Sequence, residues 1–257
     1  MLAAAALHAA WNLTLHDAPD REAAMAVAGV AAGLALLPAT LLWAPWSVLP
    51  LIALSALAEA LYALALAAAY RRGALAVAYP LARGTAPLLV TVGGWFVLAE
   101  QPAPQAALGA VGLAVGLALI ADVGRRSRQR AAVAFALVTG VAIAVYSVID
   151  ARAVREVKPA AYLGAVMLLQ GVLLSLWIGL DRRRLGAALG PGLRIAVGST
   201  AAYLLVLLAL QRAQAGRVAT LREVSILIAL LIAGSGHGRR TWIGAALVAL
   251  GAILAAI

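Results

Sequence analysis

Among the polar residues within the long apolar stretches of this 257-residue sequence, seven have side chains that could do chemistry or hold a charge. They are His8, Asn12, Glu59, Arg83, Asp150, Arg222 and Glu223. If these stretches cross a lipid bilayer, a charged side chain within them is costly and is retained for a site or for a partner. These residues are therefore the first candidates for binding a solute, carrying a proton or pairing two helices.

The segment around Arg83 carries several residues that disturb a helix. Pro80, Gly84 and Pro87 surround it, and prolines remove backbone hydrogen bonds and bend a helix. Carbonyl groups freed in this way are tolerated only inside protein or beside a cavity. Arg83 then has two interpretations. Its guanidinium binds an anionic group of a substrate, or a buried acid neutralises it and the pair ties helices together.

Glu59, Arg222 and Glu223 have roles that stay open at this point. Glu59 either carries a proton or is held by a neighbouring helix. Arg222 and Glu223 are adjacent, so on a helix their side chains point about 100° apart and cannot share one partner well. At least one of the two is expected to face the protein interior.

Aromatic and small residues mark further possible contacts. Five aromatic residues could line a cavity, pack against other helices or lie at a membrane interface. They are Trp11, Tyr62, Tyr79, Tyr146 and Tyr203. The pairs Gly29 with Gly33 and Gly112 with Gly116 have the four-residue spacing that lets helices approach closely.

Motifs for several chemistries are missing from the sequence. There is no His-Glu-x-x-His, no Gly-x-Ser-x-Gly, no Gly-x-x-x-x-Gly-Lys loop and no paired aspartate motif. The sequence contains no cysteine, which excludes disulfides and thiol chemistry. We therefore expect no catalytic residues, no resident cofactor and no metal site.

Composition indicates an integral membrane protein. Hydrophobic residues make up 65% of the chain, charged residues 12%, and the mean hydropathy is +1.00. Soluble domains carry about a quarter charged residues. The net charge of +10 comes from arginines between apolar stretches, where they meet anionic lipid. No basic stripe interleaved with aromatic residues is present, so nucleic acid is not an expected partner.

Hydropathy predicts about ten transmembrane helices, since a helix needs about 20 apolar residues to cross a bilayer. The predicted spans are 1–16, 22–43, 48–70, 74–99, 104–122, 132–151, 160–180, 192–211, 216–235 and 241–257. The first span is short, which indicates either a helix tilted at a thinned membrane edge or a true start upstream of Met1. Its polar residues do not fit a cleaved signal peptide.

An internal repeat relates the two halves. Aligning residues 69–121 with 209–255 matches Gly109 with Gly244 and Gly116 with Gly251, and places Arg83 opposite Glu223. Five helices per half is an odd number, so the copies must have opposite orientations. The predicted fold is all-α, with two inverted five-helix repeats at 1–124 and 132–257 around a central cavity and an Arg-rich linker at 125–131. An Arg83–Glu223 pair across the pseudo-twofold axis is also predicted.

The chain resembles the EamA type of the drug/metabolite transporter superfamily over nearly its whole length. The blocks that carry the resemblance are His8-Ala9-Ala10-Trp11-Asn12, Tyr70-Arg71-Arg72-Gly73, Tyr79-Pro80-Leu81-Ala82-Arg83-Gly84, Leu98-Ala99-Glu100, Tyr146-Ser147-Val148-Ile149-Asp150, Arg222-Glu223-Val224-Ser225 and Ile243-Gly244-Ala245. Relatives carry an acidic turn before the last helix that matches Glu100, but the turn from Ala233 to Arg240 has no acid here.

The resemblance implies a ten-helix carrier that moves amino acids, metabolites or amphipathic compounds, often outward, driven by proton or solute gradients. It implies cavity positions for Trp11, Asn12, Tyr79, Arg83, Tyr146 and Arg222. It also implies cytoplasmic termini. Loops after odd-numbered helices hold 13 Lys/Arg and loops after even-numbered ones hold 5, which predicts the opposite orientation. The orientation stays open.

We therefore interpret the chain as a secondary transporter, an exporter, acting in the cell membrane by alternating access. The predicted substrate-binding residues are Trp11, Asn12, Glu59, Tyr79, Arg83, Tyr146, Arg222 and Glu223. The expected partners are a small-molecule substrate and membrane lipid, with a homodimer left open. The alternatives are a membrane-embedded enzyme acting on a lipid-linked substrate and a non-transporting membrane subunit.

Overall fold

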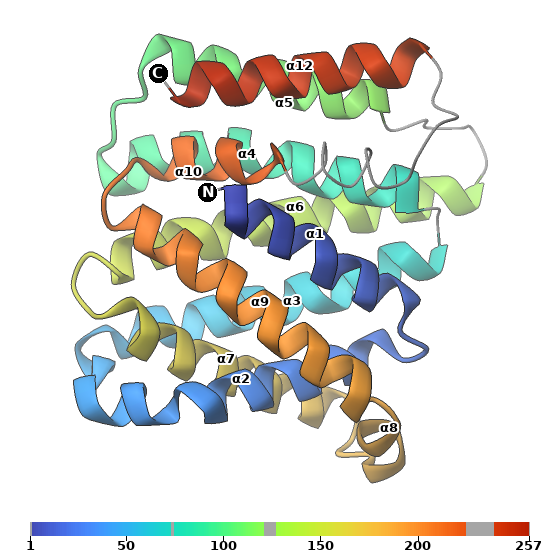
Figure 1. Ribbon diagram of the computed structural model, residues 1–257, viewed down its shortest axis with the longest axis vertical. Helices are drawn as coiled ribbons and strands as arrows, with labels where there is room; N and C mark the ends of the chain where they lie inside the picture. Colours follow the sequence, from blue (N-terminus) through green and yellow to red (C-terminus); the bar gives the residue numbers. More distant parts are fainter. Residues whose placement is uncertain (1, 73–74, 121–126, 225–238, 257) are drawn as a thin grey trace.

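The computed structural model describes residues 2–72, 75–120, 127–224 and 239–256, and in these ranges it contains helices and no strands (Figure 1). The helices of the first half are α1 (Leu2–Asp17), α2 (Arg21–Trp43), the short 3-10 helix η1 (Pro45–Val48), α3 (Leu49–Arg72), α4 (Leu75–Leu98) and α5 (Pro104–Ile120). Those of the second half are α6 (Ser127–Ala153), α7 (Pro159–Trp177), α8 (Arg182–Ala187), α9 (Leu189–Leu210), α10 (Ala215–Arg222) and α12 (Arg239–Ala256).

Five of the described helical segments are long and apolar enough to cross a membrane. They are Arg21–Trp43, Pro45–Arg72, Arg130–Ala153, Pro159–Trp177 and Leu189–Leu210. Two shorter apolar segments, Pro104–Leu119 and Trp242–Leu254, accompany them. The outward-facing side chains of the described helices include many large apolar ones, such as Leu42, Phe96 and Val197, which are more than 70% exposed. Such a surface suits lipid as its solvent.

Most predicted spans agree with helices to within a few residues, and the differences have local causes. The span predicted to Leu180 ends at Trp177, because Gly179 and Leu180 have left-handed backbone with φ of 72° and 52°. Helix α8 follows, and the Asp181 carboxylate caps it by accepting from the amides of Arg183 and Arg184. Helix α6 begins at Ser127, inside the segment predicted as a linker. The described part of the span 216–235 is α10, which ends at Arg222, and residues 225–238 lie outside the described residues.

Helix α4 is continuous through Pro80 and Pro87, from Leu75 to Leu98. The two prolines therefore do not break the helix that presents Arg83.

Helices from opposite halves of the chain pack against each other. Helix α2 lies along α7, and α5 lies along α12, as Figure 1 shows at its lower and upper edges. Helix α3 packs against α6, and α1 packs against α9. In each case a helix of the first half finds its main neighbour in the second half.

Glycines set the closeness of two of these contacts. A Cβ atom added to Gly116 would lie 2.6 Å from the carbonyl oxygen of Gly244, and one added to Gly251 would lie 2.5 Å from that of Gly109. These distances exclude any side chain, so α5 and α12 touch backbone to backbone.

The same holds for α2 and α7, where a Cβ atom on Gly29 would lie 2.8 Å from Gly171 Cα and one on Gly33 would lie 2.5 Å from Leu168 Cα. The predicted packing face is confirmed at Gly29, Gly33 and Gly116. It is wrong at Gly112, where no described atom lies within 4 Å of an added Cβ.

Candidate functional site

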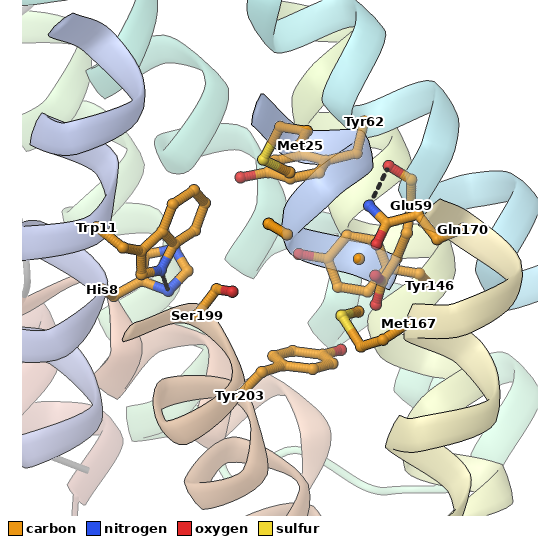
Figure 2. A pocket seen from close by; sticks show the side chains of 12 residues that line it. His8, Trp11, Met25, Glu59, Tyr62, Tyr146, Met167, Gln170, Ser199 and Tyr203 are labelled. Carbon is orange, nitrogen blue, oxygen red and sulfur yellow. Dashed lines mark hydrogen bonds between the residues drawn. The ribbon is translucent and has the colours of Figure 1, made fainter. Parts of the chain in front are cut away.

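A pocket lies between α1, α2, α3, α6, α7 and α9 (Figure 2). Its cavity volume is about 50 Å³. Its wall combines aromatic and sulfur-containing side chains with a few polar groups. The lining residues are His8, Trp11, Met25, Ala28, Gly29, Glu59, Tyr62, Tyr146, Met167, Gln170, Ser199 and Tyr203.

Aromatic rings form much of the pocket wall. Tyr146 stands edge-on to two others, with its ring centroid 5.9 Å from that of Tyr62 and 5.8 Å from that of Tyr203. His8 and Trp11 lie on the opposite side from Tyr146 in Figure 2. Edge-to-face contacts of this kind hold the rings in defined orientations. The three tyrosines come from α3, α6 and α9, so three helices must keep their relative positions to build this wall.

Glu59 supplies the acidic group of the pocket wall. The residue is only 5% exposed, and Gln170 Nε2 lies 3.4 Å from its backbone carbonyl oxygen. Within the described residues, no side chain donates a hydrogen bond to the Glu59 carboxylate. The carboxylate therefore keeps its acceptor capacity for a group that enters the pocket.

Asp150 is a second buried acid, and its surroundings differ from those of Glu59. Its Oδ1 accepts hydrogen bonds from Ser55 Oγ at 2.5 Å and Tyr162 Oη at 2.7 Å, and its Oδ2 accepts one from the Tyr203 hydroxyl. The residue has no exposed surface. Asp150 thus joins α3, α6, α7 and α9, and through Tyr203 it orients one ring of the pocket.

Arg83 and Glu223 form the buried ion pair that the internal repeat predicts. Arg83 Nε donates to Glu223 Oε2 at 2.7 Å, and the two side chains are 3% and 0% exposed. Arg83 Nη1 lies 2.8 Å from His8 Nε2. A guanidinium has no accepting atom, so His8 Nε2 must accept and Nδ1 carries the proton. The 3.3 Å approach of Trp11 Nε1 to that Nδ1 is then a ring contact rather than a hydrogen bond.

Arg222 and Glu223 are both buried, at 1% and 0% exposed. Arg222 Nε lies 3.7 Å from Glu223 Oε1. Helix α10 ends at Arg222, and Glu223 caps its C-terminus. The end of the helix lets the two neighbouring side chains approach each other, which a continuing helix would not favour.

The eight predicted substrate-binding residues fall into three groups. Trp11, Glu59 and Tyr146 line the pocket. Asn12, Arg83, Arg222 and Glu223 are buried beside it, and the Asn12 amide donates to the His8 carbonyl at 2.8 Å. Tyr79 lies in α4, but its side chain is outside the described residues. Substrate binding by any of the eight stays a prediction.

Several lining residues were not among the predicted ones. Met25, Met167 and Ser199 carry no sequence signal, because residues of these types are common in apolar helices, whereas Gln170 is a polar amide within the predicted span 160–180 and could have been found in the same way as Asn12. The sequence marks Tyr62 and Tyr203 only as aromatic residues that could line a cavity. His8 is recognisable in the sequence because a histidine is unusual within an apolar span. Its side chain lies between the pocket and Arg83.

Ion pairs join elements at one end of the bundle, where α2 begins and α3 ends. Arg184 Nε contacts Asp20 Oδ2 at 2.6 Å, and Arg71 Nη1 contacts Glu22 Oε1 at 2.7 Å. The hydrogen bond from Arg184 lowers the pKa of the Asp20 carboxyl from its usual value, and the same contact raises the pKa of Arg184. These pairs connect α2 with α3 and α8 outside the apolar segments.

Glu100 makes the corresponding connection at the other end. Its Oε2 accepts from the Ala215 amide at 2.8 Å, and its Oε1 pairs with Arg155. The end of α4 is thereby tied to the α6–α7 connection and to the start of α10. Residues 233–238 of the turn that lacks the matching acid lie outside the described residues.

Comparisons with known proteins agree with this architecture. Residues 130–257 match the sequence model of the EamA-like transporter family. A crystal structure titled only as that of a protein is similar, with a TM-score of 0.73 and 20% identity over 99% of this chain and 95% of that one. At that identity the likeness concerns the fold alone. A search of curated proteins found no match. The chain belongs to the EamA-like transporter family, within the drug/metabolite transporter superfamily, and is a membrane-embedded protein.

Proposed function

We propose that this chain is a secondary transporter that exports a small metabolite, amino acid or amphipathic compound across the cytoplasmic membrane by alternating access. One observation carries the proposal. In a member of a transporter family, six helices from both halves of the chain enclose a pocket whose wall holds an acid with unused acceptor capacity. Outward transport is the direction that the family resemblance implies.

We further propose that the chain contains ten membrane helices as two inverted repeats, at 1–124 and 132–257. The neighbours of the helices support this. If α1, α2 and α3 of the first half correspond to α6, α7 and α9 of the second, each contact between the halves has a symmetry-related counterpart. The counterpart of α3 against α6 is α9 against α1, and both contacts are present. The close glycine contacts agree with this correspondence. The counterpart of Gly116 against Gly244 is Gly251 against Gly109, and both approaches are close. Inverted repeats of this kind place a solute site between halves that can rock.

Alternating access requires each end of the bundle to open in turn. The Asp20–Arg184 and Glu22–Arg71 pairs at one end, and the Glu100–Arg155 pair at the other, are partly exposed and contribute little each. Contacts of this strength can break and form again during a transport cycle, whereas the buried Arg83–Glu223 pair is expected to stay intact.

The test is solute flux into proteoliposomes. The purified protein is first screened by thermal shift against amino acids, sugars, nucleosides and cationic dyes, because a bound ligand raises apparent stability. Each stabilising solute is then followed by mass spectrometry across an imposed proton or solute gradient. We expect gradient-dependent flux that empty liposomes lack.

Absence of flux for every solute in every gradient would overturn the transporter proposal. Turnover of a lipid-linked substrate by the purified protein would support the enzyme alternative instead. Arg83→Ala is also measured. If this variant is folded and transports as wild type does, Arg83 has no role in binding substrate.

A further inference from the structure

We propose that the pocket binds an organic cation, with its charged nitrogen beside the Glu59 carboxylate and its apolar part against the aromatic wall. This substrate class rests on the transport function proposed above and narrows it. The proposal rests on the position of the Glu59 carboxylate in a pocket wall with four aromatic rings. Within the described residues, no side chain donates a hydrogen bond to this carboxylate.

The first argument is the balance of buried charge. Among the described residues, the buried charged side chains are Arg83, Arg222, Glu59, Asp150 and Glu223. Two are positive and three are negative, so the interior carries one excess negative charge when the acids are ionised. An uncompensated charge in a medium of low dielectric constant is unfavourable. A proton on one of the acids would remove that excess, and so would a cation that takes its place in the pocket.

The second argument is that Glu59 is the acid available to such a cation. Glu223 already pairs with Arg83 and lies near Arg222. Asp150 accepts three hydroxyl hydrogen bonds, which use both of its oxygens. Glu59 lines the pocket and has no comparable donors.

The third argument excludes anions. No arginine or lysine is among the described residues that line the pocket. His8 is the basic residue of the wall, but its Nε2 faces the Arg83 guanidinium at 2.8 Å, which disfavours a second positive charge on the ring. A carboxylate or phosphate in this pocket would therefore meet the Glu59 carboxylate, with no arginine or lysine among the described lining residues to pair with it.

The aromatic wall fits the same class of ligand. Trp11, Tyr62, Tyr146 and Tyr203 line the pocket together with two methionines. Ring faces attract an ammonium group, most strongly where water is excluded. Thioethers adapt to irregular apolar shapes. An amine or quaternary ammonium attached to an apolar group satisfies all of these surfaces at once.

The test compares three benzyl compounds of similar size that differ in charge. Benzyltrimethylammonium is the cation, benzyl alcohol the neutral compound and benzoate the anion. Binding is measured by calorimetry on the purified full-length protein in detergent, for wild type, Glu59→Gln, Glu59→Asp and Glu156→Gln. Glu156 is a matched control, because its partly exposed side chain lies outside the pocket and pairs with Arg152.

We expect wild type and Glu156→Gln to bind the cation at least about tenfold more tightly than benzyl alcohol, from the ion contact and the ring contacts together. Benzoate should not bind. Glu59→Gln should lose about tenfold or more in cation affinity and keep its affinity for benzyl alcohol, and Glu59→Asp should retain most of the preference. Circular dichroism and size-exclusion chromatography check folding, and if Glu59→Gln does not fold, the comparison of ligands on wild type and Glu59→Asp decides.

Equal affinity of wild type for cation and neutral compound, or cation binding that survives Glu59→Gln, would overturn the inference. These results are distinct from failure of the transport proposal. Flux of neutral or anionic solutes that Glu59→Gln leaves unchanged would support transport and reject the cation. Glu59-dependent cation binding without flux in any gradient would support the site and reject transport.

Discussion

Neutralising Glu223 is expected to destabilise the protein more than neutralising its partner Arg83. The Glu223 carboxylate lies 2.7 Å from Arg83 Nε and 3.7 Å from Arg222 Nε, and all three side chains are at most 3% exposed. Glu223→Gln leaves two buried guanidinium groups without this counter-charge. Breaking a buried pair from one side costs about 3–5 kcal/mol. Arg83→Gln leaves Arg222 beside Glu223, so its cost should be lower, about 1–3 kcal/mol.

The assay is unfolding of the purified protein by increasing dodecyl sulfate in mixed micelles, followed by circular dichroism. Arg152→Gln is the control, since it removes an exposed pair with Glu156 and should cost no more than about 0.5 kcal/mol. The double variant Arg83→Gln with Glu223→Gln should cost less than the sum of the two single changes.

Equal costs for the two single variants, or strict additivity in the double variant, would refute this account of the pair. Exchanging the residues, with Arg83→Glu and Glu223→Arg, should restore part of the stability that each single change removes. Restoration should be incomplete, because the exchange places a new arginine directly after Arg222.

Three further predictions concern other parts of the fold. Gly251→Ala places a Cβ atom 2.5 Å from the Gly109 carbonyl oxygen and should cost about 1–3 kcal/mol; an unchanged thermal midpoint would contradict the close packing of α5 and α12. Asp150→Asn replaces an accepting oxygen by an N–H group that faces a hydroxyl donor, so the free energy of unfolding should fall by about 1–3 kcal/mol; a loss below about 0.5 kcal/mol would show that the hydroxyl groups rearrange freely. The lowered pKa of Asp20 means that the stabilisation from its contact with Arg184 is fully present above its unfolded pKa of about 4 and is lost as pH falls through the folded value. The difference in thermal midpoint between wild type and Arg184→Gln should therefore shrink on acidification below pH about 4, and a constant difference would argue against the pair.

Charged residues inside apolar stretches were the most informative part of the sequence. The cost of a charge in lipid makes Arg83 and Glu223 conspicuous, and the repeat alignment places them opposite each other. The structure contains that pair. The same alignment matched Gly116 with Gly251, and both glycines lie in one close contact between α5 and α12.

The position of each charged side chain relative to the pocket could not be predicted. Arg83 was as acceptable in a substrate site as in a structural pair, and Asp150 was one buried acid among several. Tyr162 and Ser55, which bind the Asp150 carboxylate, come from α7 and α3 and have no spacing relation to it in the sequence. Such contacts depend on the rotation of each helix about its axis.

The sequence alone determined that the chain is helical, apolar and membrane-embedded, because hydropathy and length are properties of continuous segments. It also determined which few ionisable residues need partners. Only the tertiary structure decided that Glu59 faces the pocket while Arg83 turns to Glu223 and His8. The physical reason is that helices in lipid are apolar on every side, so no polar stripe marks the outward face. Which face turns inward is then decided by packing between helices that lie far apart in the chain.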